Sequence, residues 1–240
     1  MSLLNEKYDR IVCINLKERP EKKEFIEKRL NKYNISYEFY HPVILGYSKH
    51  FVNAYVGMYN TAKRLHVPVF NKQFPNEFGT LHSHYYVIKS ALLDGIHNLF
   101  VFEDDCAFHK DWDSLLPKYL NTIPDDSDAI LLYSFMSKIE PENIRVSPRW
   151  TKGFASWSLL AYGMNRRTMQ AYVDYVDNTP TIADVVTWDL MSKKDFNFYI
   201  ASPPLVIPAK DLSSDIRGQN KNYEKTRSVF LMGINENEYE

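Results

Sequence analysis

Residues 97–105 read HNLFVFEDD, a run of aromatic and apolar residues that ends in three consecutive acids. A short apolar run of this kind is typical of a strand that is buried on both faces of a sheet. In open α/β sheets, ligands bind outside the carboxyl ends of the strands. The sequence therefore predicts that Glu103, Asp104 and Asp105 stand at the binding edge of a sheet.

The acids themselves favour a divalent cation. If the strand continues through them, Glu103 and Asp105 point to the same side, roughly 6–7 Å apart. Two unit charges at that distance repel by roughly 2–3 kcal/mol at an effective dielectric near 20, and a cation would turn this repulsion into attraction. Oxygen ligands favour Mg²⁺, Mn²⁺ or Ca²⁺ over Zn²⁺. The alternative is structural: Asp104 and Asp105 cap the next helix or turn, and Glu103 is solvated.

The first forty residues predict the start of an α/β sheet. Residues 10–16, RIVCINL, indicate a buried strand, and Pro20 suits the first turn of a helix. In residues 20–33 the apolar side chains form one stripe and the charged ones another, so the lysines are expected on a solvated face. Residues 35–40 indicate a second strand, and strand–helix–strand begins an α/β fold.

Further elements follow along the chain. Helices are predicted over 81–95, ending at Gly95, over 112–121 and over 165–177, with strands over 129–133 and 156–164 and a long loop over 134–154. Residues 46–77 have no assignment, and 208–240 indicate a mobile lid or a frayed tail. The length favours a single domain over residues 1–240.

The composition excludes several classes of protein. Apolar residues make up 45% and charged residues 25%, which excludes wholesale disorder. Lys+Arg is 29 against Asp+Glu 30, a balance that argues against coating nucleic acid or an anionic membrane. The opening MSLLNEKYDR is not expected to be a signal peptide, because charge interrupts it early, and no apolar run approaches the ~20 residues of a membrane span. Cys13 and Cys106 are expected to be buried, reduced thiols in a cytoplasmic protein.

His82, Ser83 and His84 open the helix predicted before the acidic strand. This predicts that Ser83 and His84 lie near a helix N-terminus, where an anion is favoured. The alternative is a capping serine and a packed histidine. A zinc site or a serine hydrolase is unsupported, since neither H-E-x-x-H nor G-x-S-x-G occurs. Dinucleotide and P-loop fingerprints are also absent from the sequence.

Four segments, taken in order, resemble the family 25 glycosyltransferases, the lipopolysaccharide-type and collagen galactosyltransferase group. IVCINLKERPEKK is similar to the family's opening strand and Arg-containing loop, and LFVFEDDCAF is close to its L-x-L-E-D-D-x-x-F. NEFGTLHSH resembles G-E-x-G-C-x-x-S-H, with Asn76 and Thr80 replacing a Gly and the Cys. AYGMNRRTMQ, TIAD, PPLVIP and SSDI form a weaker fourth match, and the resemblance spans about residues 10–217.

The resemblance implies a GT-A-type, Rossmann-like α/β domain with a mixed central sheet flanked by helices. It also implies transfer of a hexose, most often galactose, from a UDP-sugar to a hydroxyl of a glycan acceptor with inversion, in lipopolysaccharide biosynthesis. Such a protein is expected in the cytoplasm, reaching a membrane only through its acceptor.

The resemblance also assigns roles to residues. Mn²⁺ or Mg²⁺ is expected on the D-x-D-type motif, with Glu103, Asp105 and Asp215 as metal ligands. The nucleotide is expected against Asn15, Leu16, Arg19, Ser83, His84, Glu103 and Asp104, and Lys22 stands where some members carry a second Arg. Asp184 is the expected general base, with Asp189 in reserve, and a helix-start or surface carboxylate is the alternative for either. Trp150, Trp157 and Trp188 are candidates for stacking on sugars, with core packing as the alternative.

Two other functions remain open at this level. One is a catalytically silent relative that binds carbohydrate or a partner through its aromatic surface. The other is a metal-dependent phosphoesterase that uses the acids with His82 and His84.

Overall fold

The computed structural model describes residues 2–42, 74–134, 144–153, 157–179, 182–193, 195–210, 212, 231 and 233–240. Asp215 and most of the unassigned stretch 46–77 lie outside these residues, as does much of the segment 208–240.

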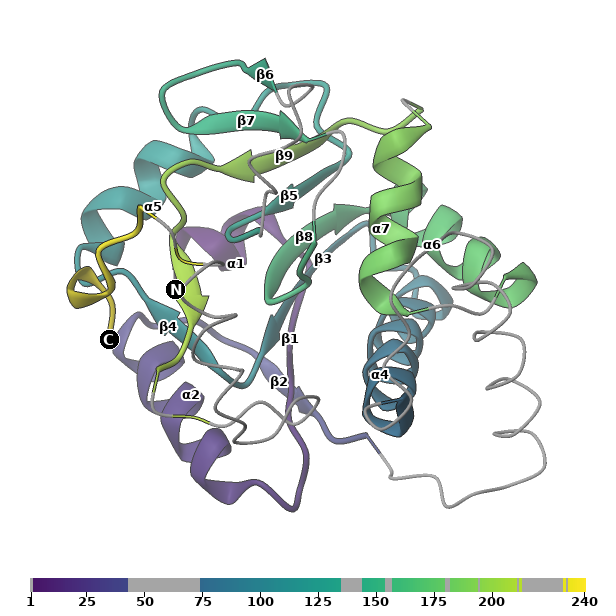
Figure 1. The fold of residues 1–240 in the computed structure, drawn as a ribbon, viewed down its shortest axis with the longest axis horizontal. Coiled ribbons are helices and arrows are strands. Elements are labelled where there is room, and N and C mark those ends of the chain that lie inside the picture. Colours follow the sequence, from purple (N-terminus) through teal and green to yellow (C-terminus); the bar gives the residue numbers. More distant parts are fainter. Residues whose placement is uncertain are drawn as a thin grey trace.

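A mixed sheet of eight strands forms the centre of the fold, in the order β2-β1-β3-β8-β5-β9-β7-β6 (Figure 1). The strands are β1 (Arg10–Ile14), β2 (Glu38–Tyr40), β3 (Asn98–Glu103), β5 (Ala129–Leu131), β6 (Ile144–Arg145), β7 (Trp150–Gly153), β8 (Ala161–Asn165) and β9 (Phe198–Ala201). Strand β1 runs parallel to β2 and β3, whereas β8 is antiparallel to β3 and β5. Two further strands, β4 (Cys106–Phe108) and β10 (Val206–Pro208), pair antiparallel beside it.

Helices cover both faces of the sheet, because side chains of the central strands alternate between two cores. On β3, Phe100 and Phe102 face the core that includes α1 (Leu3–Lys7), α2 (Pro20–Lys32) and α5 (Trp112–Leu120). Leu99 and Val101 face the core of α4 (Phe74–Leu93), α6 (Arg166–Asn178) and α7 (Ala183–Ser192). Figure 1 shows α2 and α5 on one side of the sheet and α4, α6 and α7 on the other. The predicted mixed sheet flanked by helices is confirmed.

Two local predictions are wrong. Helix α4 begins at Phe74 rather than at residue 81, since Gly79 lies inside the helix and does not interrupt it. It ends as predicted before Gly95, whose φ of +77° suits glycine. The predicted loop 134–154 contains β6 and β7, because β7 pairs with β9 and buries Trp150 in the core.

The C-terminal residues lie against β4. The N–H of Phe108 donates to the carbonyl of Glu240 and the N–H of Glu240 donates back, each at 2.9 Å. The Tyr239 hydroxyl donates to the carbonyl of Pro204 at 2.8 Å. Within the described ranges, no helix is long and apolar enough to cross a bilayer.

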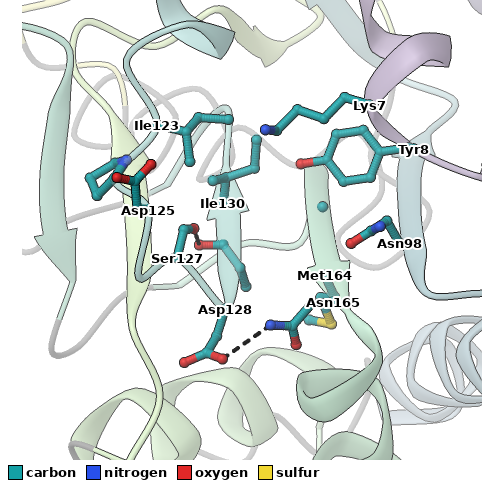
Figure 2. Close-up of a pocket in the computed structure, with 13 residues that line it drawn as sticks. Lys7, Tyr8, Asn98, Ile123, Asp125, Ser127, Asp128, Ile130, Met164 and Asn165 are labelled. Carbon is teal, nitrogen blue, oxygen red and sulfur yellow. Dashed lines mark hydrogen bonds between the residues drawn. The ribbon is translucent and has the colours of Figure 1, made fainter.

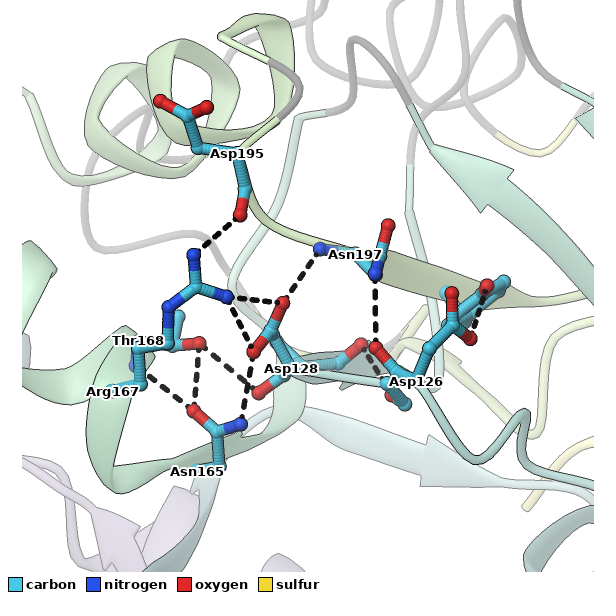
Figure 3. Close-up of polar contacts among 10 residues, drawn as sticks. Asp126, Asp128, Asn165, Arg167, Thr168, Asp195 and Asn197 are labelled. Carbon is cyan, nitrogen blue, oxygen red and sulfur yellow. Dashed lines mark hydrogen bonds and ion pairs between the residues drawn. The ribbon is translucent and has the colours of Figure 1, made fainter.

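A polar cluster around Asp128 fixes the edge of the sheet where β5 and β9 begin (Figure 3). The buried carboxylate of Asp128 accepts from Arg167 at 3.1 Å, from the side-chain amide of Asn165 at 3.1 Å and from the N–H of Asn197 at 2.9 Å. Asn165 also caps α6, since its side chain accepts from the N–H of Thr168. One carboxylate therefore connects β5, the start of α6 and the start of β9.

The replacement Asp128→Ala is expected to lower the free energy of unfolding by about 2 kcal/mol, because several donors lose a buried acceptor. For a chain of this size that is a fall in Tm of about 4–8 °C, measurable by thermal denaturation. Asp125→Ala is the matched control, because Asp125 is exposed in the same loop. Equal Tm values for the two variants would contradict a structural role for Asp128.

Candidate active site at the carboxyl ends of β1 and β3

The carboxyl ends of β1 and β3 lie side by side, because the parallel register pairs Ile14 with Glu103. The residues that follow each strand therefore meet. The side-chain amide of Asn15 donates to Asp104 Oδ2 at 2.8 Å and to the carbonyl of Arg19 at 3.3 Å. Asn15 is 1% exposed and Asp104 is 7% exposed, so this contact is shielded from water.

Three helices begin at this edge of the sheet. Helix α2 follows the carboxyl end of β1, and α4 runs toward the amino end of β3, so the N-terminus of α4 lies at the carboxyl edge. Helix α6 begins where the antiparallel β8 ends and returns along the sheet, so α7 also begins at the carboxyl edge. Helix N-termini carry partial positive charge and favour anions.

The three acids are divided between the two helical layers. Strand β3 ends at Glu103, and Asp104 and Asp105 form the turn into β4. The expectation that Glu103 and Asp105 alternate along one strand is therefore wrong. Glu103 contacts α4, while Asp104 and Asp105 contact α2.

His84 holds Glu103. Its Nε2 lies 3.1 Å from Glu103 Oε1 and donates to it, because a carboxylate can only accept. Its Nδ1 lies 2.9 Å from the Tyr162 hydroxyl, and burial raises the pKa of that hydroxyl well above its ordinary value. His84 is 1% exposed, and the packed histidine of the alternative interpretation is what the structure has.

The prediction that Ser83 and His84 lie near a helix N-terminus is wrong, because α4 begins well before them, at Phe74. The Ser83 hydroxyl instead donates to the carbonyl of Gly79 at 2.7 Å, within the helix. The contact between His84 and Glu103, across nineteen residues, has no signal in the sequence.

Lys22 lies beneath the acidic turn. Its side chain is 2% exposed, and Nζ is 3.5 Å from Asp104 Oδ1 and 3.8 Å from Asp105 Oδ2. The expected solvated face of lysines is therefore wrong at this position. Lys22 stands in the first turn of α2, which follows the carboxyl end of β1 along the chain.

Burial has the largest effect on the pKa values of the two aspartates in the acidic turn. It raises the pKa of Asp105 to about 7 and that of Asp104 above its ordinary value, while the Lys22 charge acts in the opposite direction on both. Burial and the nearby acids also raise the pKa of the Cys13 and Cys106 thiols. Both cysteines are free and buried, as predicted from their apolar surroundings.

The donor set fits a hard divalent cation in part. Two buried side-chain oxygens at this site, Asn15 Oδ1 and Asp105 Oδ1, have no hydrogen-bond partner in the described structure. Such oxygens are the ligands that Mg²⁺ and Mn²⁺ prefer. No group of three metal-ligating side chains gathers among the described residues, and Asp215 is not one of them. The fit therefore requires further oxygens, which a diphosphate carries.

The loop from β1 to α2 places the other expected nucleotide contacts. Leu16 and Arg19 are partly exposed there, and Arg19 Nε forms an ion pair with Glu21 at 2.5 Å. His41 Nδ1 lies 2.9 Å from the carbonyl of Asn15, so the end of β2 supports the same loop.

The structure distinguishes the two base candidates by position. Asp184 lies in the first turn of α7, at the carboxyl edge. Asp189 lies about 7.5 Å farther along the helix axis and forms an ion pair with Lys193 at 2.7 Å.

The three tryptophans differ as well. Trp150 is fully buried and donates from its indole N–H to the carbonyl of Tyr119 at 3.1 Å, so it belongs to the core. Trp157 and Trp188 are partly exposed and stack on each other, with ring centroids 6.3 Å apart and an interplanar angle of 22°. Trp157 lies in the segment that leads into β8. In the same segment, the carbonyl of Leu160 accepts a hydrogen bond from the N–H of Glu103 at 2.8 Å.

A cavity of about 280 Å³ opens at the opposite edge of the sheet (Figure 2). Lys7, Tyr8 and Asn98 line one side, and Asp125 and Asp128 line another. None of the residues expected to bind nucleotide, metal or acceptor lines it.

The Tyr162→Phe variant tests the support of Glu103 through His84. Loss of this buried hydroxyl is expected to lower the unfolding free energy by about 1–2 kcal/mol, or about 2–8 °C in Tm. Tyr86→Phe is the control, because Tyr86 is 46% exposed. If Tyr162→Phe melts with the control, the hydroxyl does not stabilise His84.

No curated protein matches the sequence. Among solved structures, a glycosyltransferase involved in the glycosylation of the major capsid of PBCV-1 aligns with 7% identity and a TM-score of 0.47, over 85% of this chain and 93% of that chain. Mannose-1-phosphate geranyltransferase from Thermus thermophilus aligns with 11% identity and a TM-score of 0.34, over 79% and 58%. A197 from STIV aligns with 10% identity and a TM-score of 0.33, over 88% and 100%.

The family model for glycosyltransferase family 25 (LPS biosynthesis protein) matches residues 9–187, which hold both strands of the site, the acidic turn and helix α4. This chain therefore belongs to glycosyltransferase family 25.

Proposed function

We propose that the chain transfers a hexose from a nucleoside diphosphate sugar to a hydroxyl of a glycan acceptor, with Mn²⁺ or Mg²⁺ and with inversion. UDP-galactose is the proposed donor. Membership of a glycosyltransferase family supports the transfer reaction. The observation that carries the proposed site is the acidic turn at the carboxyl ends of β1 and β3, where two buried oxygens lack hydrogen-bond partners in the described structure.

Each residue of the turn has a proposed task. Asp105 and Glu103 would hold the cation, while Asp104 fixes the turn through Asn15 and Lys22. When bound, the cation would offset the negative charge that develops on the departing diphosphate. The N-termini of α2, α4 and α7 add partial positive charge at the same edge, and they favour the same anion.

Inversion requires a base on the face of the sugar opposite the leaving group. Asp184 is the proposed base, because α7 begins at the carboxyl edge and places this carboxylate there. Trp188 lies one turn along the same helix and stacks on Trp157, and this pair is the proposed platform for the acceptor sugar.

The first test incubates the purified protein with a panel of nucleotide sugars and Mn²⁺. Transfer or slow donor hydrolysis is expected with UDP-galactose and is expected to stop when EDTA is added. Asp105→Asn is expected to reduce turnover at least ~100-fold, because it removes charge where the leaving group is stabilised. Asp125→Asn, an exposed carboxylate at the opposite edge, is the control.

If no nucleotide sugar of the panel is bound or hydrolysed, the proposed glycosyltransferase activity is wrong. Glycan binding that is indifferent to EDTA would then favour the silent, carbohydrate-binding relative. Phosphate release without a sugar nucleotide would favour a phosphoesterase.

The second test separates the two base candidates. Asp184→Asn is expected to lower kcat by about 10²–10⁴-fold while the Kd for the donor nucleotide stays unchanged, as for loss of a general base. Asp189→Asn is the paired variant on the same helix and is expected to retain most of kcat. The reverse order of the two effects would move the base to Asp189.

A further inference from the structure

Lys22 is a buried ammonium in direct contact with the acidic turn. Its side chain is 2% exposed, whereas a lysine on a helix surface is ordinarily solvated. It reaches Asp104 Oδ1 at 3.5 Å and Asp105 Oδ2 at 3.8 Å, so one cation bridges both carboxylates. It uses one oxygen of Asp105 and leaves the other, Oδ1, without a hydrogen-bond partner among the described residues.

The acidic turn carries more negative charge than Lys22 can offset. When all three are ionised, Glu103, Asp104 and Asp105 place three negative charges at one strand end, and Lys22 offsets one of them before any ligand arrives. A buried carboxylate without a counter-charge is costly, and Lys22 offsets that cost at Asp104, which is 7% exposed. The same ammonium repels a second cation that approaches alone.

We propose that Lys22 is the resident counter-cation of the acidic turn. It holds Asp104 and Asp105 in place in the empty protein and weakens the binding of a free divalent cation. The cation then binds tightly only together with a nucleoside diphosphate, whose negative charges offset the ammonium and whose oxygens complete the ligand set. This inference rests on the cation of the proposed function, and it adds the order in which the ligands bind.

Calorimetry with Mn²⁺ alone, then with Mn²⁺ and UDP, tests the proposal on four purified proteins: wild type, Lys22→Met, Lys22→Arg and Lys28→Met. Lys28 is the control, because it is an exposed lysine on the same helix. Wild type is expected to bind Mn²⁺ alone at least ~10-fold more weakly than in the presence of UDP. Lys22→Met is expected to bind Mn²⁺ alone at least ~10-fold more tightly than wild type, because a nearby positive charge is gone.

The charge-retaining Lys22→Arg and the control Lys28→Met are expected to bind Mn²⁺ as wild type does. The proposal is wrong if Lys22→Met binds Mn²⁺ alone no more tightly than wild type. It is also wrong if Lys22→Arg gains affinity as Lys22→Met does, since the charge would not be the cause.

Thermal denaturation without metal supplies the second readout. Lys22→Met is expected to melt at least ~6 °C below wild type, because the buried Asp104 and the partly buried Asp105 lose their counter-charge, and Mn²⁺ is expected to restore at least half of the difference. If this variant does not fold, Lys22→Met/Asp104→Asn is expected to fold and to melt near wild type, since one buried charge of each sign is removed together. Failure of the double variant to fold would overturn the proposal.

The two hypotheses fail separately. If no nucleotide sugar is turned over but Lys22→Met shows the tighter Mn²⁺ binding and the lower Tm, the counter-cation stands and the proposed transferase activity does not. If turnover is found but Mn²⁺ binding is unchanged in Lys22→Met, the transferase stands and the counter-cation does not.

Discussion

The buried carboxylate of Asp104 is the group on which the rest of the site depends. A carboxylate that is 7% exposed must be compensated by hydrogen bonds and charge. Asn15 supplies the hydrogen bond from the end of β1, and Lys22 supplies the charge from the first turn of α2. Because both partners come from one strand–loop–helix unit, the pairing of β1 with β3 and the shape of the acidic turn are fixed together.

The acids are held by helices on opposite faces of the sheet. Glu103 belongs to the layer of α4 through His84 and Tyr162, whereas Asp104 and Asp105 belong to the layer of α2 through Lys22. A shift of either layer along the sheet would move one set of acids relative to the other. The distance between the carboxylates is thus set by the packing of both cores and not by the turn alone.

Two aspartates at opposite edges of the sheet, Asp128 and Asp105, show how a structural acid differs from an acid available to a ligand. Asp128 accepts hydrogen bonds at both oxygens from Asn165, Arg167 and Asn197, as Figure 3 shows. Asp105 Oδ1 is also buried, although the Asp105 side chain as a whole is 19% exposed, and no described group donates to this oxygen. Buried polar atoms are ordinarily hydrogen-bonded, so a bound ligand has a physical reason at this oxygen, as at Asn15 Oδ1.

The sequence by itself determined the α/β class, the two strands of the site and the location of the acids, but not the start of α4 or the strands β6 and β7. Short apolar runs before Asn15 and Asp104 specify buried strands, and the ordered motifs specify the family. Only the tertiary structure decided that Lys22 contacts Asp104 and that His84 contacts Glu103. It also decided that β3 ends at Glu103, before Asp104. The physical reason is range, since periodicity reports which face of one element is buried, whereas these contacts join residues 19 to 89 positions apart, through strand register and helix packing.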